Sequence, residues 1–517
     1  MLRSRITPLV AVTLLVAACS SAATPAPVVQ PTPQTVVITA PPVVQPTPEI
    51  ITPAPVATPE VTPAPTPGPA AVPAVPTGFT ALDSALGGAY KGKAIDIQTQ
   101  WIGGEGANFA ASVADFQAAT GITINIEGVG SSHETVLRTR IEGNSPPDIA
   151  MLAQPSAIVA YGDEGKLVDL ASFLSPAEMT KLSSEHPATI GLLTEGSKLW
   201  GIPYKVDVKS TVWYPIKAFA AAGYDVPKTC DDLMALSDKI VAAGSNPWCI
   251  GMEAGTATGW QATDWLEEVE LKTQGVDWYN KTVTNEVKFS DPGVKAALDN
   301  YVGKIFFTPN YVYGGVQAIA ATHQTDPMDP MFPTDGSDNW TATTPKCWMQ
   351  KQATWYGPDF FPDVKAGAKT SQFVLGQDIG IFEFPTIDPT LGQVVEGSGD
   401  SLLIPKPASG DVRPEVEAFA EFLSTPQGTQ RWIEAGSAIS ANVSTPADWY
   451  AGAYKLQVAS QIVATAKGFG FDASDLMPAV VGAGKEWSEL TDWINGGGTN
   501  PTTTDALKAI DDAWPTK

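Results

Sequence analysis

The 517-residue chain has few basic residues and few histidines. Lysine and arginine together number 31 against 55 aspartates and glutamates, so the formal net charge is −24. Nucleic-acid binding requires a basic surface, and no segment of this sequence supplies one. The three histidines, His133, His186 and His323, are far apart, and none forms the His-x-x-x-His pair of a zinc site. The sequence therefore indicates neither a nucleic-acid partner nor a metal site.

Motifs of common catalytic and nucleotide-binding sites are also missing. The chain contains no Gly-x-Ser-x-Gly elbow, no Gly-x-x-x-x-Gly-Lys-Ser/Thr loop and no Gly-x-Gly-x-x-Gly fingerprint. These absences disfavour an α/β-hydrolase, a P-loop nucleotidase and a dinucleotide-binding enzyme. We expect neither a cofactor nor enzymatic activity.

The first 19 residues have the pattern of a bacterial export signal. Arg3 and Arg5 precede an apolar run that is shorter than the roughly 20 residues needed to span a bilayer. The sequence Val16-Ala17-Ala18-Cys19 resembles a lipobox, in which the cysteine is lipidated and becomes the first mature residue; the alternative is an ordinary signal peptide followed by a chance cysteine. We expect residues 1–19 to be a lipoprotein signal peptide. The mature protein would then be extracytoplasmic, anchored to the bacterial cell membrane through Cys19.

Residues 20–78 have the composition of a spacer. They contain 17 prolines among threonine, alanine and valine, and their only charged residues are Glu49 and Glu60. Such a segment cannot bury a core and favours extended polyproline II, at most about 3.1 Å per residue. An SH3-type ligand is the alternative, but it belongs to the cytoplasm and conflicts with the export signal. We expect a Pro/Thr-rich linker that holds a folded domain away from the membrane.

From Phe79 onward, strand-like and helical patterns alternate. Residues 94–101 alternate with period two, residues 109–120 have helical spacing, and residues 122–126 return to a strand. A helix over 132–142 and a strand over 148–152 follow. This order predicts a largely parallel sheet, whose ligands bind at the carboxyl ends of the strands.

Helices dominate the rest of the chain, with two further strands. We expect helices over 231–243, 263–273, 292–305 and 413–435, strands over 379–384 and 401–404, and a mostly helical end after Tyr454. No internal repeat or flexible linker interrupts residues 79–517. The pattern predicts one compact unit whose chain passes between two lobes.

Tryptophan lies next to acids or amides in several predicted loops. All 15 tryptophans follow position 100. The motifs are Trp101 to Glu105, Gln154-Pro155, Trp260 to Trp265, Trp348 with Trp355, and Gly397-Ser398-Gly399-Asp400 before a strand. A pyranose packs its C–H face on an aromatic ring, and its hydroxyls pair with carboxylates and amides. A single tryptophan is more often core, and Asp264 and Asp400 could be caps, but the recurrence at strand ends indicates a carbohydrate ligand.

Several longer phrases resemble the extracytoplasmic solute-binding proteins (family 1) of ABC-type sugar importers, in particular the α-glucoside-binding subset. The phrases are WIGGEGANF (101–109), PPDIAMLAQP (146–155), WGIPYKVDVKSTVWY (200–214), PWCIGMEAGTATGWQATDW (247–265), PKCWMQKQATWY (345–356) and FAEFLSTPQGTQRWIEAGSAISAN (419–442). Their order and spacing cover nearly all of residues 90–445.

The resemblance implies a two-lobed α/β fold of the periplasmic-binding-protein type (type II), with a ligand cleft between lobes joined by hinge strands. Lobe 1 would comprise residues 79–205 and 380–438, and lobe 2 residues 206–379 and 439–517. The chain would cross between them near Val206, Ile379 and Ile439.

The resemblance also implies ligand-binding residues. Glu105, Gln154 and Asp400 would reach the sugar from lobe 1; Trp260, Asp264 and Trp355 would reach it from lobe 2, with the tryptophans as stacking platforms. The sequence differs from the usual Gly-Gly-Asp at Gly397 to Asp400.

Cysteine usage is compatible with export. With Cys19 lipidated, Cys230, Cys249 and Cys347 remain, so at most one disulfide forms, and count alone leaves three pairings or none. The family resemblance favours the bridge between Cys249 and Cys347.

We therefore predict a monomeric receptor that captures an α-glucoside or oligosaccharide and delivers it to the transmembrane subunits of an ABC permease. Two alternatives remain open. A secreted glycoside hydrolase would also combine tryptophans with carboxylates. A stalked carbohydrate-binding adhesin would not need hinge closure.

Overall fold

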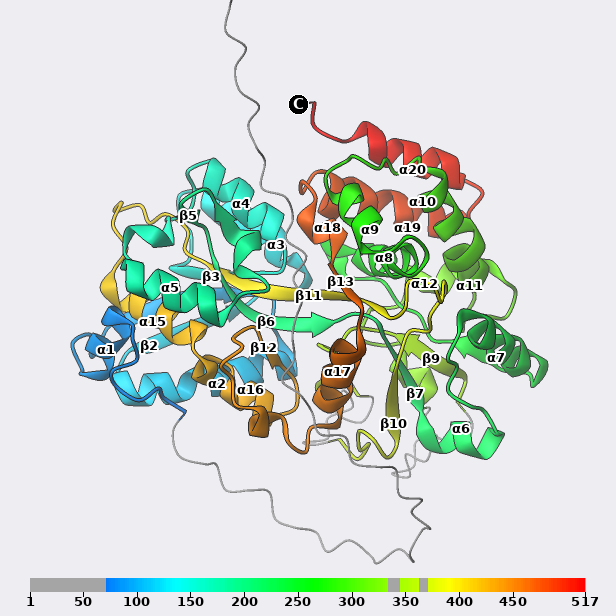
Figure 1. Ribbon diagram of the computed structural model, residues 1–517, viewed down its shortest axis with the longest axis horizontal. Helices are drawn as coiled ribbons and strands as arrows, with labels where there is room; N and C mark the ends of the chain where they lie inside the picture. The colour runs from blue at the N-terminus through cyan, green and yellow to red at the C-terminus, as the bar shows by residue number, and fades with distance from the viewer. Residues whose placement is uncertain (1–70, 333–344, 362–370, 517) are drawn as a thin grey trace, which may run out of the picture. The chain divides into compact units, whose positions relative to one another are not determined.

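The computed structural model describes residues 71–332, 345–361 and 371–516, all within the compact unit Pro53–Lys517 (Figure 1). The predicted signal peptide, Cys19 and most of the proline-rich linker lie outside the described residues. Among the described residues, no helix is long and apolar enough to cross a membrane.

A seven-stranded sheet forms one side of the fold. Its order is β12-β6-β11-β3-β1-β2, with β13 beside β11. The strands are β1 (Ala94–Thr99), β2 (Thr123–Gly128), β3 (Ile149–Leu152), β6 (Ile202–Val208), β11 (Val394–Leu403), β12 (Ile439–Ser440) and β13 (Gly468–Phe471). β1 is parallel to β2 and β3, as the β-α-β-α-β pattern predicts. β11 runs antiparallel to β3 and β6, so the sheet is mixed rather than largely parallel.

Helices cover this sheet with their apolar faces. In α2 (Gly103–Thr120), the residues Phe109, Val113 and Phe116 recur at helical spacing and are buried. Gly121 ends the helix in the left-handed conformation, with φ of 70°. The other helices on this side are α1 (Thr80–Leu86), α3 (His133–Glu142), α4 (Pro155–Asp163), α5 (Pro176–Glu185), α15 (Pro414–Ser424) and α16 (Gln430–Glu434). A short ribbon, β4 (Thr194–Glu195) with β5 (Lys198–Leu199), precedes β6.

A second sheet, of order β10-β7-β9-β8, forms the other side. Its strands are β7 (Thr211–Pro215), β8 (Asn246–Trp248), β9 (Cys347–Lys351) and β10 (Ile379–Glu383). The helices that follow β7 are α6 (Ile216–Ala222), α7 (Cys230–Ala242), α8 (Trp260–Gln274), α9 (Val276–Val283), α10 (Pro292–Ala297), α11 (Gly303–Phe307), α12 (Val316–Ile319) and α13 (Met328–Met331). The C-terminal helices are α17 (Tyr454–Thr465), α18 (Ala473–Leu476), α19 (Trp487–Asn495) and α20 (Thr503–Asp512).

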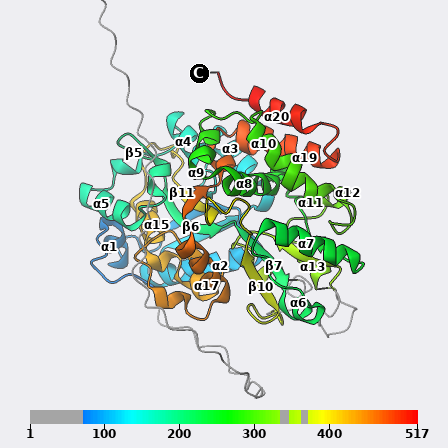
Figure 2. The ribbon, with the colours of Figure 1, turned by 45° about the vertical axis from the view of Figure 1, so that its right-hand side comes forward.

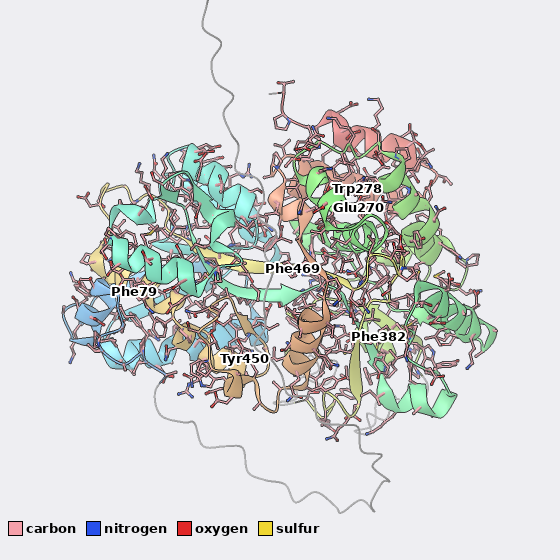
Figure 3. The ribbon with its side chains drawn as sticks, viewed as in Figure 1. Phe79, Glu270, Trp278, Phe382, Tyr450 and Phe469 are labelled. Carbon is pink, nitrogen blue, oxygen red and sulfur yellow. A yellow bond between two sulfur atoms is a disulfide. The ribbon has the colours of Figure 1, made fainter. Side chains whose placement is uncertain are left out.

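Each sheet has its own large apolar core, and we call the parts around these cores lobe 1 and lobe 2. Phe79 is buried in the core of lobe 1, and Phe382 in the core of lobe 2 (Figure 3). The two-core arrangement has the form of two α/β lobes, which is the fold class that the resemblance implies.

β6 and β11 carry the chain between the lobes and lie side by side in both views (Figure 1, Figure 2). Val394 belongs to the core of lobe 2, whereas Leu402 and Leu403 belong to that of lobe 1. The change of lobe therefore occurs inside β11, and the expected crossing near Ile379 lies instead within the sheet of lobe 2. β10 is a short, mostly apolar strand, and that pattern does not specify which sheet a strand joins.

The segment Gly397 to Asp400 lies within β11, although its glycines predict a loop. A β-carbon on Gly399 would lie 2.5 Å from the carbonyl oxygen of Lys205, and one on Gly397 would lie 2.3 Å from the Phe469 ring. Both glycines thus allow neighbouring groups to approach β11 closely. The register shifts between Asp400 and Ser401, and this irregularity marks the passage between the lobes.

One disulfide joins Cys249, just after β8, to Cys347 at the start of β9. It is the pairing that the resemblance favours. Cys230 is a free, buried thiol.

Candidate functional site

Three charged side chains alternate along β6 and the residue that follows it, at the junction of the lobes. Lys205 and Asp207 are spaced by two residues and lie on one face of β6, and Lys209 continues this spacing directly after the strand ends at Val208. All three are at most 5% exposed. Buried charges are stable only when they are paired, and each of the two lysines has carboxylate partners. These lysines organise the predicted site residues into two groups.

The first group surrounds Lys205. Its ammonium lies 2.7 Å from a carboxylate oxygen of Asp207 and 2.7 Å from one of Asp400. Burial by itself lowers the pKa of Lys205, but the two aspartates outweigh burial and raise it above the usual value. Gln100, directly after β1, donates a hydrogen bond from Nε2 to Asp400.

Glu105 belongs to the same group and lies in the first turn of α2. Burial raises the pKa of its carboxyl to about 8; Lys205 opposes the rise, and Asp400 adds to it. At neutral pH the Glu105 carboxyl is therefore mainly protonated, and it can donate as well as accept a hydrogen bond.

The second group surrounds Lys209. Its ammonium lies 2.6 Å from a carboxylate oxygen of Asp264 and also pairs with Asp472. It sits 5.3 Å from the centre of the Trp260 ring, within cation–π range. Trp260 and Asp264 are one turn apart at the start of α8, so both project from the same face of that helix.

Trp355 completes this group from the loop after β9. Its ring centre lies 6.1 Å from that of Trp260, and the two rings are inclined by 56°. Both rings are only partly buried. The neighbouring Thr354 donates a hydrogen bond of 3.2 Å to Asp207, which connects the aromatic pair to the first group.

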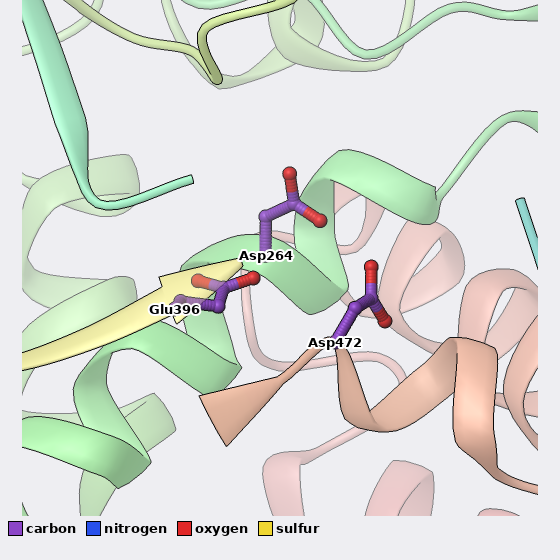
Figure 4. Close-up of side chains that lie close together, drawn as sticks. All are labelled: Asp264, Glu396 and Asp472. Carbon is purple, nitrogen blue, oxygen red and sulfur yellow. The ribbon is translucent and has the colours of Figure 1, made fainter. Parts of the chain in front are cut away.

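Asp264, Glu396 and Asp472 form a buried acidic cluster (Figure 4). Three of their carboxylate oxygens, one from each residue, lie within 4.8 Å of one another. The ammonium of Lys209 already bridges two of these carboxylates, and that of Lys351 lies 3.6 Å from Glu396. Burial raises the pKa of Glu396 well above its usual value, although Lys351 opposes it. The cluster could hold a metal cation only if Lys209 moved away.

Gln154 is at the amino end of α4, where it faces lobe 2. Its side chain hydrogen-bonds to Asp475 in α18, and Ser156 Oγ donates to the Asp475 carbonyl oxygen at 2.8 Å. Burial raises the pKa of the Asp475 carboxyl well above its usual value, Asp472 raises it further, and the Gln154 hydrogen bond lowers it. Gln154 therefore contributes to a contact between the lobes.

A second contact between the lobes involves two short 3₁₀ helices, η1 (Gly130–Ser132) and η4 (Gly255–Ala257). Thr256 Oγ1 donates a hydrogen bond of 3.0 Å to the carbonyl oxygen of Ser131. The structure is thus in a closed arrangement. A cavity of about 10 Å³, the space of roughly one water molecule, lies beside Lys205 and Asp400 and is also lined by Phe471 at the end of β13. A sugar is too large for this cavity, so it can bind there only if the lobes first separate.

The structure therefore brings all six predicted site residues to the junction of the lobes, grouped around residues that the sequence analysis did not identify. Lys205, Asp207 and Lys209 carry a detectable signal, because a charge at every second position is unusual in and directly after a strand that is otherwise apolar. Asp472 has no such signal, since only the pairing of β13 with β11 brings it to Lys209.

Comparison with known proteins identifies the family. The family described as "Bacterial extracellular solute-binding protein" matches residues 101–430 of the chain. The chain belongs to this family. It is 34% identical over 431 residues to the alpha-glucosides-binding periplasmic protein AglE of Rhizobium meliloti, covering 82% of this chain and 87% of that protein. It is 31% identical to the osmoprotective compounds-binding protein GgtB of Synechocystis, covering 82% and 93%. The family expected from the motif phrases is confirmed.

Solved structures show the same fold. A chitin oligosaccharide binding protein aligns with a TM-score of 0.65 at 17% identity, covering 81% of this chain and 98% of that chain. The bacterial solute receptor AcbH aligns with a TM-score of 0.64 at 16% identity and similar coverage. The predicted two-lobed periplasmic-binding-protein fold is thus confirmed. Family members are extracellular, which agrees with the predicted extracytoplasmic location.

Proposed function

We propose that the protein is the receptor of an ABC importer for α-glucosides or related oligosaccharides. The observation that carries this proposal is the 34% identity to AglE over most of both chains. The composition of the site supports it, because partly exposed tryptophans adjoin carboxylates and amides at the junction of the lobes. Hydroxyls of a sugar pair with such groups, and its C–H faces pack on the rings.

In this proposal, Glu105, Gln154 and Asp400 contact the ligand from lobe 1, and Trp260, Asp264 and Trp355 from lobe 2. A ligand that touches both lobes favours the closed form over the open one by its difference in affinity for the two. The closed receptor then presents its cargo to the transmembrane subunits of the permease.

Titration calorimetry with the purified protein tests the ligand class. The panel is maltose, trehalose, sucrose and longer glucans, and the name of GgtB adds osmoprotective compounds to it. Saturable binding of a glucoside is expected. If no member of the panel binds, the proposed ligand class is wrong. Recovery of the bound sugar intact distinguishes a receptor from a glycoside hydrolase, which would return cleavage products.

The membrane attachment is a separate part of the proposal. Cys19 would carry the lipid, and residues 20–78 would separate it from the lobes. Fractionation of cells that express the full chain tests this. Cys19→Ala is expected to move the protein from the membrane to the soluble fraction, and a variant that remains on the membrane would contradict lipidation at Cys19.

A further inference from the structure

Two glutamines of lobe 1 have buried side-chain oxygens without partners. Gln100 follows β1, and Gln154 lies between β3 and α4. The Oε1 atom of each is buried and has no hydrogen-bond partner in the described part of the chain. Both positions are at the carboxyl ends of parallel strands, where ligands of α/β sheets bind. An acceptor that is buried without a donor costs free energy, and a ligand hydroxyl would remove that cost.

The chemistry of its neighbours fixes the orientation of Gln100. Its Nε2 donates to Asp400, whose carboxylate also pairs with Lys205. An ionised carboxylate only accepts hydrogen bonds, so the amide nitrogen must face Asp400 and the oxygen must face away. Gln100 therefore presents a fixed acceptor beside an expected ligand-binding carboxylate.

Lobe 2 also has buried donors without partners. Gln261 Nε2 lies beside Trp260 in the first turn of α8, and the Trp487 ring packs against Trp260 and Ala257. Neither Gln261 Nε2 nor Trp487 Nε1 has an acceptor among the described residues. Unpaired donors also occur in lobe 1, where Trp432 Nε1 is buried without a described acceptor, so Gln100 is distinguished by its place beside Asp400 rather than by its lobe.

We propose that Gln100 is a further specificity-determining residue, and that its fixed, unpaired acceptor selects neutral, hydroxyl-rich ligands over sugar acids and sugar phosphates. This inference rests on the proposed function. A ligand hydroxyl can donate to Gln100 Oε1. A carboxylate or phosphate only accepts, so it leaves Gln100 Oε1 unpaired. It is also repelled by Asp207 and Asp400, whose two negative charges exceed the single charge of Lys205.

The first test compares Gln100→Leu with Gln350→Leu. Gln350 is a matched control, because its side-chain oxygen is also buried without a described partner, but it lies on β9 and is 2% exposed. Calorimetry uses the glucoside that binds the wild-type protein most tightly. We expect its Kd for Gln100→Leu to be about tenfold higher than for the wild type. Gln350→Leu is expected to change it less than twofold. Equal affinity of Gln100→Leu and the wild type would overturn the role of Gln100.

Gln100→Glu provides a second variant in case Gln100→Leu does not fold. It keeps the shape of the side chain but places a second carboxyl against Asp400. Weak binding at pH 8 that recovers toward the wild-type value at pH 5, where the new carboxyl can be protonated, is expected. Affinity equal to the wild type at both pH values would overturn the proposal.

A second binding experiment changes the ligand instead of the protein. It uses the uronate of the bound glucoside, in which a carboxylate replaces the hydroxymethyl group. At least tenfold weaker binding of the uronate is expected; equal binding would overturn the selectivity for neutral ligands while leaving the receptor function intact. If the wild-type protein binds no sugar of the panel, the proposed function is wrong, and this inference is wrong with it.

Discussion

At the scale of single residues, Trp355 has the clearest expected effect on binding. Its ring is partly exposed and lies 6.1 Å from that of Trp260. If the ring stacks on a sugar, Trp355→Ala should weaken binding by at least about 1 kcal/mol, or roughly fivefold in Kd, as measured by calorimetry. Trp278→Ala is the control, because Trp278 is also partly buried but lies on α9 (Figure 3). Unchanged affinity of Trp355→Ala would remove this ring from the site.

Glu421 connects a single carboxyl to the pH dependence of stability. It is 3% exposed in α15, it accepts a hydrogen bond of 2.7 Å from the Leu82 N–H, and burial raises its pKa to about 8. The folded state therefore retains a proton that the unfolded state releases above about pH 4.5. The contribution of Glu421 to the free energy of unfolding therefore falls as pH rises from about 4.5 to about 8, and it is constant above that range.

Glu421→Gln should remove this contribution, since an amide does not titrate but still accepts from Leu82. Melting temperatures measured from pH 5 to pH 8 are expected to rise for the variant relative to the wild type as pH increases. The exposed carboxyl Glu142, changed to Gln, serves as the control. A difference between variant and wild type that does not depend on pH would contradict a raised pKa of Glu421 in the folded state.

At the scale of secondary-structure elements, the disulfide ties β8 to β9. Cys249 and Cys347 are 98 residues apart, so the bridge closes a long loop and restricts the unfolded chain. The double variant Cys249→Ala/Cys347→Ala should lose about 2–4 kcal/mol of unfolding free energy in urea. Reducing agent should lower the stability of the wild type toward that of the variant and leave the variant unchanged. Equal stability of the two proteins without reductant would contradict this role.

Secondary structure was largely predictable where hydrophobic periodicity was long and unbroken. The helix expected over 263–273 is part of α8, and the strand expected over 379–384 is β10. The helix expected over 292–305 contains a π-helical turn, η5 (Leu298–Val302), which the apolar spacing does not reveal. The loop expected at Gly397 to Asp400 is a strand, because glycine allows close packing as well as turns.

At the scale of the whole molecule, a disulfide engineered across the contact between η1 and η4 can test whether the lobes must separate before a sugar binds. A β-carbon on Gly255 would lie 3.5 Å from that of Ser131, within the range of a disulfide. The variant Ser131→Cys/Gly255→Cys should therefore form a bridge across the closed lobes, at a conformational cost of about 1–2 kcal/mol because Gly255 has a φ of 58°.

Once oxidised without ligand, this double variant should bind sugar at least about tenfold more slowly than the wild type, because the junction of the lobes stays closed. Mild reduction should restore binding. Stopped-flow fluorescence measures the rate, and Ser131→Cys alone serves as the control. Rapid binding by the oxidised variant would show that ligand reaches its site without separation of the lobes.

The linear pattern of residues, through its resemblance to a known family, was sufficient for the family and the α/β class, because periodicity and motif spacing are local properties of the chain. It did not place the passage between the lobes in β11, nor reveal that Lys205 and Lys209 organise the site. Those features depend on pairings between distant segments, such as Lys209 with Asp472 and β6 with β11. Burial makes such pairings obligatory, since a lysine in a dry interior requires a carboxylate partner, and only the folded chain determines which carboxylate is near.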